Sequence, residues 1–161
     1  MIHNRFNHDF SSLLQGFVPN KLAIAVSGGS DSVALLYLVS FWARQYKTEL
    51  IIFSVNHNLR PESVCEIDYV ESITKALGHE FYSLSWKYDG NKVGLQERAR
   101  HGRYRLMTDK CYQISVQILL TAHHLDDNLE TYLMRKNRNS GVFGLSSANS
   151  FFNSLIISLK D

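Results

Sequence analysis

Cysteine is scarce in this sequence. Only Cys65 and Cys111 occur among 161 residues, and no Cys-x-x-Cys pair is present. A zinc ribbon or an iron–sulfur cluster, whose ligands are usually closely spaced cysteines, therefore has no support. Two thiols in a chain without other cysteines fit a protein of a reducing compartment.

Long apolar runs are also missing. None reaches the ~20 residues that cross a bilayer, and residues 1–15 lack the apolar core of a signal peptide. We therefore expect a cytoplasmic protein without a membrane partner. The length of 161 residues and the apolar content of 45% suit a single domain with a substantial core. The formal net charge of +2 is too small to indicate a nucleic-acid partner by itself.

Residues 22–38, LAIAVSGGSDSVALLYL, are the most informative stretch. The apolar run 22–26 is too short for a helix and suits a strand buried on both faces. It ends at Ser-Gly-Gly-Ser-Asp-Ser, residues 27–32, where two glycines allow a sharp turn and the polar residues favour a helix start. A strand, a glycine turn and a helix N-terminus together predict an anion site, because N–H groups and the helix dipole both favour phosphate.

Two missing sequence motifs limit the kind of ligand that this turn can be expected to bind. No lysine precedes the hydroxyl residue, so the turn is not a P-loop of the Gly-x-x-x-x-Gly-Lys-Ser/Thr type. Gly-x-Gly-x-x-Gly is missing as well, so a dinucleotide fingerprint is not supported. A plain strand-to-helix turn is the alternative for a lone Gly-Gly pair, but the full hexad with its flanks favours the anion site.

The rest of the chain alternates between strand and helix patterns. Further strands are expected at 49–55, 80–86 and 115–121, and helices near 10–17, 30–43, 61–77, 94–111 and 128–136. This alternation predicts an α/β fold, with a Rossmann-like parallel sheet and helices on both faces.

Three polar segments follow the first, second and fourth predicted strands, at 27–32, 56–63 and 122–128. Parallel strands end at one edge of a sheet, where α/β proteins bind their ligands. We therefore expect the three segments to share a nucleotide site. In the second segment, His57 and Arg60 are candidates for binding, with a solvated loop as the alternative.

The predicted helix near 94–111 carries most of the positive charge. Residues 95–113 contain five Lys or Arg and two Asp or Glu. Arg100 and Arg103 are three residues apart and share a helix face beside Tyr104. Arginine matches phosphate geometry, and an adjacent aromatic ring can stack on a base. A solvated basic face is the alternative.

The segment AHHLDDNLET, residues 122–131, is rich in metal-ligand types. A structural zinc site ranks low, because cysteines are absent nearby and no spaced histidine pair follows. Paired carboxylates suit Mg²⁺, which prefers oxygen ligands and bridges phosphates. Two roles stay open for Asp127: to hold Mg²⁺ together with Asp31, or to anchor a substrate ammonium group.

These motifs resemble a known family. The hexad 27–32 resembles the pyrophosphate loop Ser-Gly-Gly-x-Asp-Ser of the N-type ATP pyrophosphatases, or PP-loop superfamily, whose fold is adenine nucleotide α-hydrolase-like. Segments 56–60, 99–104 and 123–131 resemble those of the tRNA(Ile)-lysidine synthetases, and the likeness runs from about 21 to 147. Asn139 replaces a glycine of the family pattern. Residues 148–161 depart from the family, and we expect no counterpart of its C-terminal tRNA-binding domains.

The resemblance implies a reaction and its participants. ATP would adenylate the C2 oxygen of the wobble cytidine in tRNA(Ile) with a CAU anticodon, and free lysine would displace AMP to give lysidine. The implied catalytic residues are Asp31, Arg103 and Asp127, and Asp31 and Asp127 would also hold Mg²⁺. The implied ATP-binding residues are Ser27, Gly28, Gly29, Ser30, Asp31 and Ser32. The implied substrate-binding residues are His57, Arg60, Arg100, Arg103 and His124.

Two other functions remain open at this point, as does a homodimer. The first is another PP-loop ATP pyrophosphatase acting on tRNA, such as a thiolase or an amidotransferase-coupled synthetase. A thiolase of the 2-thiocytidine type would need the Cys-x-x-Cys pair that is missing. The second is a non-catalytic module that binds a nucleotide or RNA.

Overall fold

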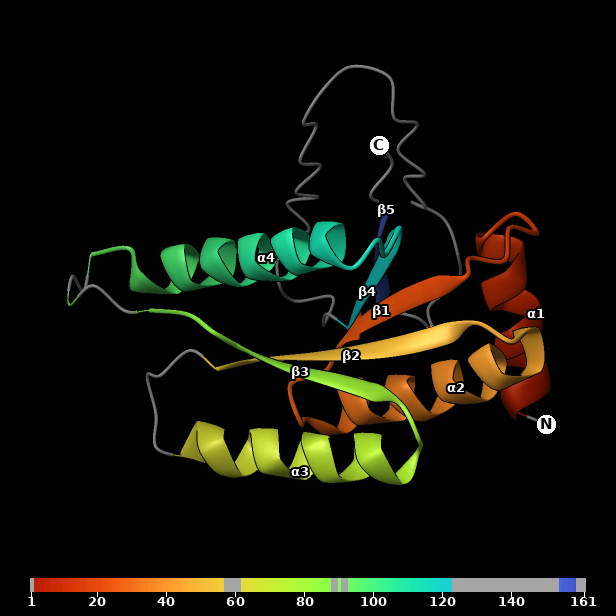
Figure 1. The fold of residues 1–161 in the computed structure, drawn as a ribbon, viewed down its shortest axis with the longest axis horizontal. Helices are drawn as coiled ribbons and strands as arrows, with labels where there is room; N and C mark the ends of the chain where they lie inside the picture. The colour runs from red at the N-terminus through yellow and green to blue at the C-terminus, as the bar shows by residue number, and fades with distance from the viewer. Residues whose placement is uncertain (1, 57–61, 88–89, 91–92, 123–153, 159–161) are drawn as a thin grey trace, which may run out of the picture.

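The structure is a computed structural model that describes residues 2–56, 62–87, 90, 93–122 and 154–158 (Figure 1). The elements follow in the order α1 (Ile2–Leu13), β1 (Lys21–Ala25), α2 (Ser30–Tyr46), β2 (Glu49–Asn56), α3 (Glu62–Ala76), β3 (Glu80–Ser85), α4 (Leu95–Gln113), β4 (Ile118–Ala122) and β5 (Ser154–Ser158).

The strands form one sheet in the order β3-β2-β1-β4-β5. The first four strands are parallel, and β1 lies between β2 and β4. Ala23 is paired with Ile51 on one side and with Leu119 on the other. This arrangement confirms the predicted α/β fold with a parallel sheet.

The fifth strand was not predicted. β5 pairs antiparallel with β4, and Ile157 lies opposite Leu119. The sequence shows an apolar triplet here, but the stretch follows no strand–helix alternation that would mark it as part of the sheet. An antiparallel edge strand on an otherwise parallel sheet is common in large mixed sheets.

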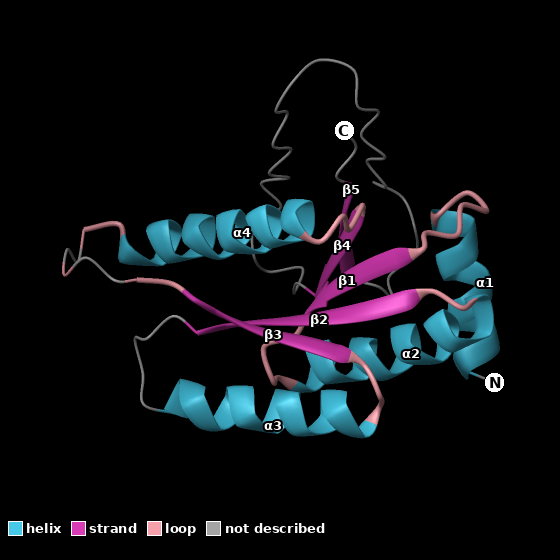
Figure 2. Cartoon of the chain, viewed as in Figure 1, coloured by secondary structure: helices cyan, strands magenta, loops and turns pink. Residues whose placement is uncertain are grey.

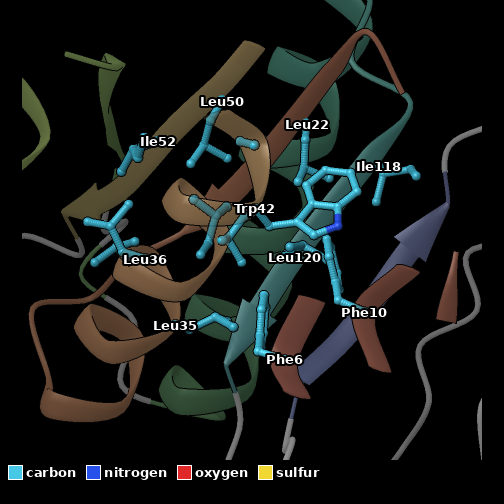
Figure 3. Close-up of a cluster of buried hydrophobic side chains, with 14 of the residues drawn as sticks. Phe6, Phe10, Leu22, Leu35, Leu36, Trp42, Leu50, Ile52, Ile118 and Leu120 are labelled. Carbon is cyan, nitrogen blue, oxygen red and sulfur yellow. The ribbon is translucent and has the colours of Figure 1, made fainter. Parts of the chain in front are cut away.

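Helices cover both faces of the sheet, as predicted (Figure 2). Strand residues alternate between two apolar clusters, because successive side chains point to opposite faces. On one face, strand side chains pack with α1, α2 and α3 (Figure 3); they are Leu22, Ile24, Leu50, Ile52, Ile118 and Leu120. On the other face the strand side chains Ala23, Ile51, Phe53 and Leu119 pack with α4.

The first helix differs from its prediction. A helix was expected near 10–17, but α1 spans Ile2–Leu13 and Phe17 lies beyond it, 52% exposed. Phe10 packs edge-on against the fully buried Trp42 ring, with centroids 4.9 Å apart. Trp42 Nε1 donates a hydrogen bond of 3.0 Å to Ser11 Oγ, so the indole has a polar partner within the core. None of the helices in the described part of the chain is long and apolar enough to cross a membrane.

The remaining boundaries lie within a few residues of the predictions. The largest shifts are of three residues: α2 was expected to end at 43 and ends at Tyr46, and the fourth strand was expected from Ser115 and begins at Ile118. Ser115 has a φ of +58° and belongs to the turn that leaves α4. The helix expected at 128–136 lies outside the described residues.

The two cysteines should differ sharply in reactivity. Cys65 is exposed on α3, whereas Cys111 is buried beneath α4 and burial raises its pKa to about 12. Because only the thiolate reacts, a raised pKa and burial both protect Cys111. At pH 8, we expect an aromatic disulfide reagent to titrate one thiol in the native protein and two in guanidinium. Cys65→Ser should abolish the native reaction, and two native thiols reacting at similar rates would contradict the buried position of Cys111.

Candidate functional site

The predicted anion site lies where β1 passes into α2. The Val26 N–H donates to the Phe53 carbonyl at 2.8 Å, which extends the β1–β2 ladder by one residue. Gly29 is the N-cap of α2, with extended backbone at φ −69° and ψ 156° and no side-chain cap. The first N–H groups of a helix have no intrahelical acceptor, so this uncapped start can bind an anion.

The side chain of Ser32 braces this turn. Its Oγ donates a hydrogen bond of 2.9 Å to the Gly29 carbonyl and accepts one of 3.2 Å from the Ser27 N–H. The Ser27 and Ser32 hydroxyls lie 3.2 Å apart. A hydroxyl carries one hydrogen, so Ser32 uses its hydrogen on Gly29 and Ser27 must donate to Ser32. Both hydroxyl hydrogens therefore shape the turn itself.

This bracing refines the prediction for the hexad. In this structure the Ser27 N–H and the Ser27 and Ser32 hydroxyls bond within the turn, and the ATP-binding roles of Ser27 and Ser32 stay predictions. Among the described residues, the Gly28 and Gly29 N–H groups donate to no backbone acceptor. These two amides, with the start of α2 behind them, are the donors that the turn offers to a phosphate.

Gly28 fits where other residues would not. Its φ of +92° is one that L side chains rarely adopt. A Cβ added there would lie 3.4 Å from Glu66 Cβ and 3.6 Å from Val70 Cγ2, both on α3. These are ordinary van der Waals distances, so it is the conformation, and not the packing of α3, that favours glycine.

The acidic residue of the hexad lies beside the turn. Asp31 is in the first turn of α2 and is exposed, and the Ser30 hydroxyl is 3.4 Å from its carboxylate. A carboxylate next to a phosphate site repels the phosphate unless a cation lies between them. A cation bound between them would remove this repulsion.

The three polar segments were expected to meet at one edge of the sheet, and the structure describes this arrangement up to the ends of the strands that precede them. β1, β2 and β4 are parallel neighbours, so Ala25, Asn56 and Ala122 leave the sheet at the same edge. The residues that follow the last two strands, including His57, Arg60, His124 and Asp127, lie outside the described residues, as does Asn139. Their positions stay predictions.

The structure describes Arg100 and Arg103 of α4, and the burial of their neighbour Tyr104 corrects a prediction. Arg100 and Arg103 are both partly exposed, and the Arg103 guanidinium lies 5.3 Å from the centroid of the Tyr104 ring. Tyr104 was expected to be available for stacking on a base, which is wrong: only 8% of it is exposed and it packs with Met107 in the core. Residues 104, 107 and 111 form the buried stripe of the helix. This spacing, and not the basic residues beside it, decides that Tyr104 is buried.

Sequence reasoning did not single out a contact between Trp86 and Gly102. A Cβ added to Gly102 would lie 2.1 Å from Trp86 Nε1, so the indole rests directly on the backbone of α4. A glycine within a helix costs about 1 kcal/mol relative to alanine. A glycine inside the predicted helix 94–111 was therefore a signal of close approach that could have been used.

Replacing Gly28 should destabilise the protein through its backbone conformation. Gly78 is the matched comparison, because its φ is also positive, at +75°, and no described atom lies within 4 Å of its added Cβ. A Cβ at Gly28 would make ordinary van der Waals contact with α3, so we expect Gly28→Ala and Gly78→Ala each to cost about 1–2 kcal/mol from backbone strain. Urea unfolding measures both, and a loss in Gly28→Ala several times that in Gly78→Ala would contradict a purely conformational role of Gly28.

Replacing Ser32 tests the brace. Ser32→Ala leaves the Ser27 N–H without its partner and removes the second donor to the Gly29 carbonyl, so the unfolding free energy should fall by about 1–2 kcal/mol. The control Ser30→Ala, at an exposed position of the same hexad, should stay within about 0.5 kcal/mol of wild type. If the two variants unfold at the same urea concentration, the turn does not depend on the Ser32 hydroxyl.

Comparison with known proteins gives a family and several relatives. A family described as the PP-loop domain matches residues 2–157. The tRNA(Ile)-lysidine synthase of Rickettsia bellii is 51% identical over 149 residues, which are 92% of this chain and 35% of that relative. The one of Rickettsia rickettsii (strain Sheila Smith) is 48% identical over 158 residues, 98% of this chain and 33% of that relative. The chain thus spans about a third of the length of these curated relatives.

Solved structures resemble the fold. The U34-tRNA thiolase NcsA from Methanococcus maripaludis superposes with a TM-score of 0.64 at 20% identity, over 77% of this chain and 46% of that one. An NH₃-dependent NAD synthetase from Campylobacter jejuni gives 0.56 at 13% identity, over 73% of this chain and 53% of that one. At these identities the likeness concerns the fold alone. The family match covers the strand, the glycine turn and nearly every described element, and the chain therefore belongs to the PP-loop domain family.

Proposed function

We propose that this chain carries the ATP-dependent chemistry of a tRNA(Ile)-lysidine synthase. The C2 oxygen of the wobble cytidine in tRNA(Ile) with a CAU anticodon attacks the α-phosphate of ATP, and pyrophosphate leaves. The amine of free lysine then attacks C2, and AMP leaves with that oxygen. The supporting observation is the turn after β1, whose Gly28 and Gly29 amides have no backbone acceptor in the described part of the chain and lie beside the start of α2. About 50% identity to lysidine synthases over most of the chain supports lysine ligation over other PP-loop reactions.

The turn acts on the leaving group. Negative charge grows on the pyrophosphate as its bond to the α-phosphorus breaks. The two glycine amides and the dipole of α2 stabilise that charge, and they need little rearrangement because Ser32 already holds the turn. Ser27 and Ser32 contribute by shape, while Ser30 and Asp31 remain exposed beside the site.

Mg²⁺ is proposed as the cation of this site. The exposed Asp31 carboxylate beside the turn is an oxygen donor of the kind that Mg²⁺ accepts, and nucleotide-bound Mg²⁺ needs only one or two carboxylates. Asp31 therefore fits, with Asp127 as the proposed second ligand. When bound, Mg²⁺ offsets the charge of the phosphates. The alternative role of Asp127, as an anchor for the lysine ammonium group, is kept as part of the proposal.

The residues proposed to bind substrates belong to α4 or follow strands that end at one edge of the sheet. Arg100 and Arg103 would contact phosphate or the target nucleotide of the tRNA, and both remain partly exposed although their neighbours Ala99 and Tyr104 are in the core. His57, Arg60 and His124 are proposed to bind substrates because they follow strands that end beside β1. The cytoplasm, where tRNA and free lysine occur together, is the proposed location.

One observation weighs against the rival sulfur-transfer function. Cys65 is exposed on α3, and Cys111 is buried beneath α4 on the opposite face of the sheet. The two thiols therefore cannot act as a pair that holds sulfur or an iron–sulfur cluster. Lysine ligation needs no such pair.

Two substitutions test the proposed roles. Asp31→Asn should lower AMP formation with tRNA(Ile) and lysine by roughly 100-fold, because the cation loses its carboxylate. Arg103→Ala should lower kcat/KM for tRNA by roughly tenfold through a lost charge-assisted contact. Controls from an exposed ion pair on α4, Asp109→Asn and Arg105→Ala, should stay near wild type, because that pair is 3.9 Å long and solvated.

The same assay separates the three functions. Labelled lysine should enter the tRNA with one AMP released for each lysine. Labelled sulfur or ammonia in the product would instead support another PP-loop enzyme. ATP binding by wild type without any AMP would support a non-catalytic module. If both Asp31→Asn and Arg103→Ala match wild type, the assigned roles are wrong.

A further inference from the structure

The first half of α4 buries few side chains in the core. The buried residues of this helix are Ala99, Tyr104, Met107 and Cys111, and only Ala99 belongs to its first half. The last three pack against the central strands through side chains such as Ile51 and Leu119. Arg100 and Arg103 therefore lie in or beside a part of α4 that needs another anchor.

Trp86 is placed to be that anchor. It follows β3 directly, and its N–H donates to the Asn56 carbonyl at 2.8 Å, so its backbone is tied to the end of β2. Its side chain is partly buried. The added Cβ of Gly102 would lie 2.3 Å from Trp86 Cδ1 and 3.0 Å from Cε2, besides the contact with Nε1. The five-membered ring of the indole thus occupies the space that any other residue at 102 would fill.

The position of this contact links it to the proposed site. β2 and β3 are parallel to β1, so Asn56 and Trp86 lie at the edge of the sheet where the glycine turn lies. Gly102 is the residue before Arg103 and two residues after Arg100. A contact at Gly102 therefore sets where both arginines lie relative to that edge.

We propose that Trp86 is a positioning residue, whose indole, seated on Gly102, fixes the first half of α4 so that Arg100 and Arg103 can engage tRNA. The inference rests on the proposed function for its substrate. Trp86 touches neither ATP nor tRNA in this account. Its effect should therefore appear in the use of tRNA and leave the use of ATP unchanged.

A double-mutant cycle tests the contact. Gly102→Ala should raise KM for tRNA roughly tenfold, because displaced arginines lose their alignment, while KM for ATP stays within about twofold. Trp86→Ala should act in the same direction. In the Trp86→Ala background, Gly102→Ala should have no further effect, because the added methyl group then has room. Gln113→Ala, at the exposed far end of α4, is the control and should leave both KM values unchanged.

Hydrogen exchange gives a second readout that does not depend on activity. Amides of 95–103 should exchange faster in Gly102→Ala and Trp86→Ala, whereas those of 107–113 should not change. Equal effects on tRNA and ATP, additive effects in the cycle, or exchange that changes uniformly along α4 would overturn the proposal. If wild type forms no AMP with tRNA and lysine, the proposed function fails for this chain. The exchange experiment then decides alone whether Trp86 fixes α4.

Discussion

The hydrogen bonds of one buried hydroxyl hold the turn on which the site depends. Ser32 Oγ joins the Ser27 N–H, the last amide before the glycines, to the carbonyl of Gly29, where α2 begins. Both bonds lie within the turn. The glycine amides between them have no backbone acceptor within the described residues. A turn that satisfies itself internally and leaves the glycine amides over, next to a helix start, is suited to bind an anion.

The sheet and its two apolar clusters fix the position of this turn. β1 is central and buried on both faces, so its end is fixed by β2 and β4 on either side. α3 packs against Gly28 from one face, and α4 covers the other. The proposed phosphate site thus adjoins the layer of α2 and α3, whereas the basic helix α4 lies in the opposite layer, and the strands between them set their separation.

Much of the fold could be predicted because its signals are local. Short apolar runs gave the four parallel strands, and the Ser-Gly-Gly-Ser-Asp-Ser hexad gave the turn. The failures depend on distant contacts. Tyr104 looked like a base-stacking residue from its neighbours but belongs to the core, and β5 is a strand only because β4 offers it an edge. Trp86 is 16 positions from Gly102, and only the packing of α4 on the sheet brings them together.

The proposed function depends above all on the two glycine amides binding the pyrophosphate group of ATP. The most direct measurement is a titration of the ¹⁵N-labelled protein with pyrophosphate and Mg²⁺, followed by amide NMR. The Gly28 and Gly29 resonances should shift downfield and saturate together, as expected for new hydrogen bonds to an anion, while those of Gly78 and Gly102 stay in place. Unmoved Gly28 and Gly29 resonances at saturating pyrophosphate, or equal shifts at all four glycines, would contradict it.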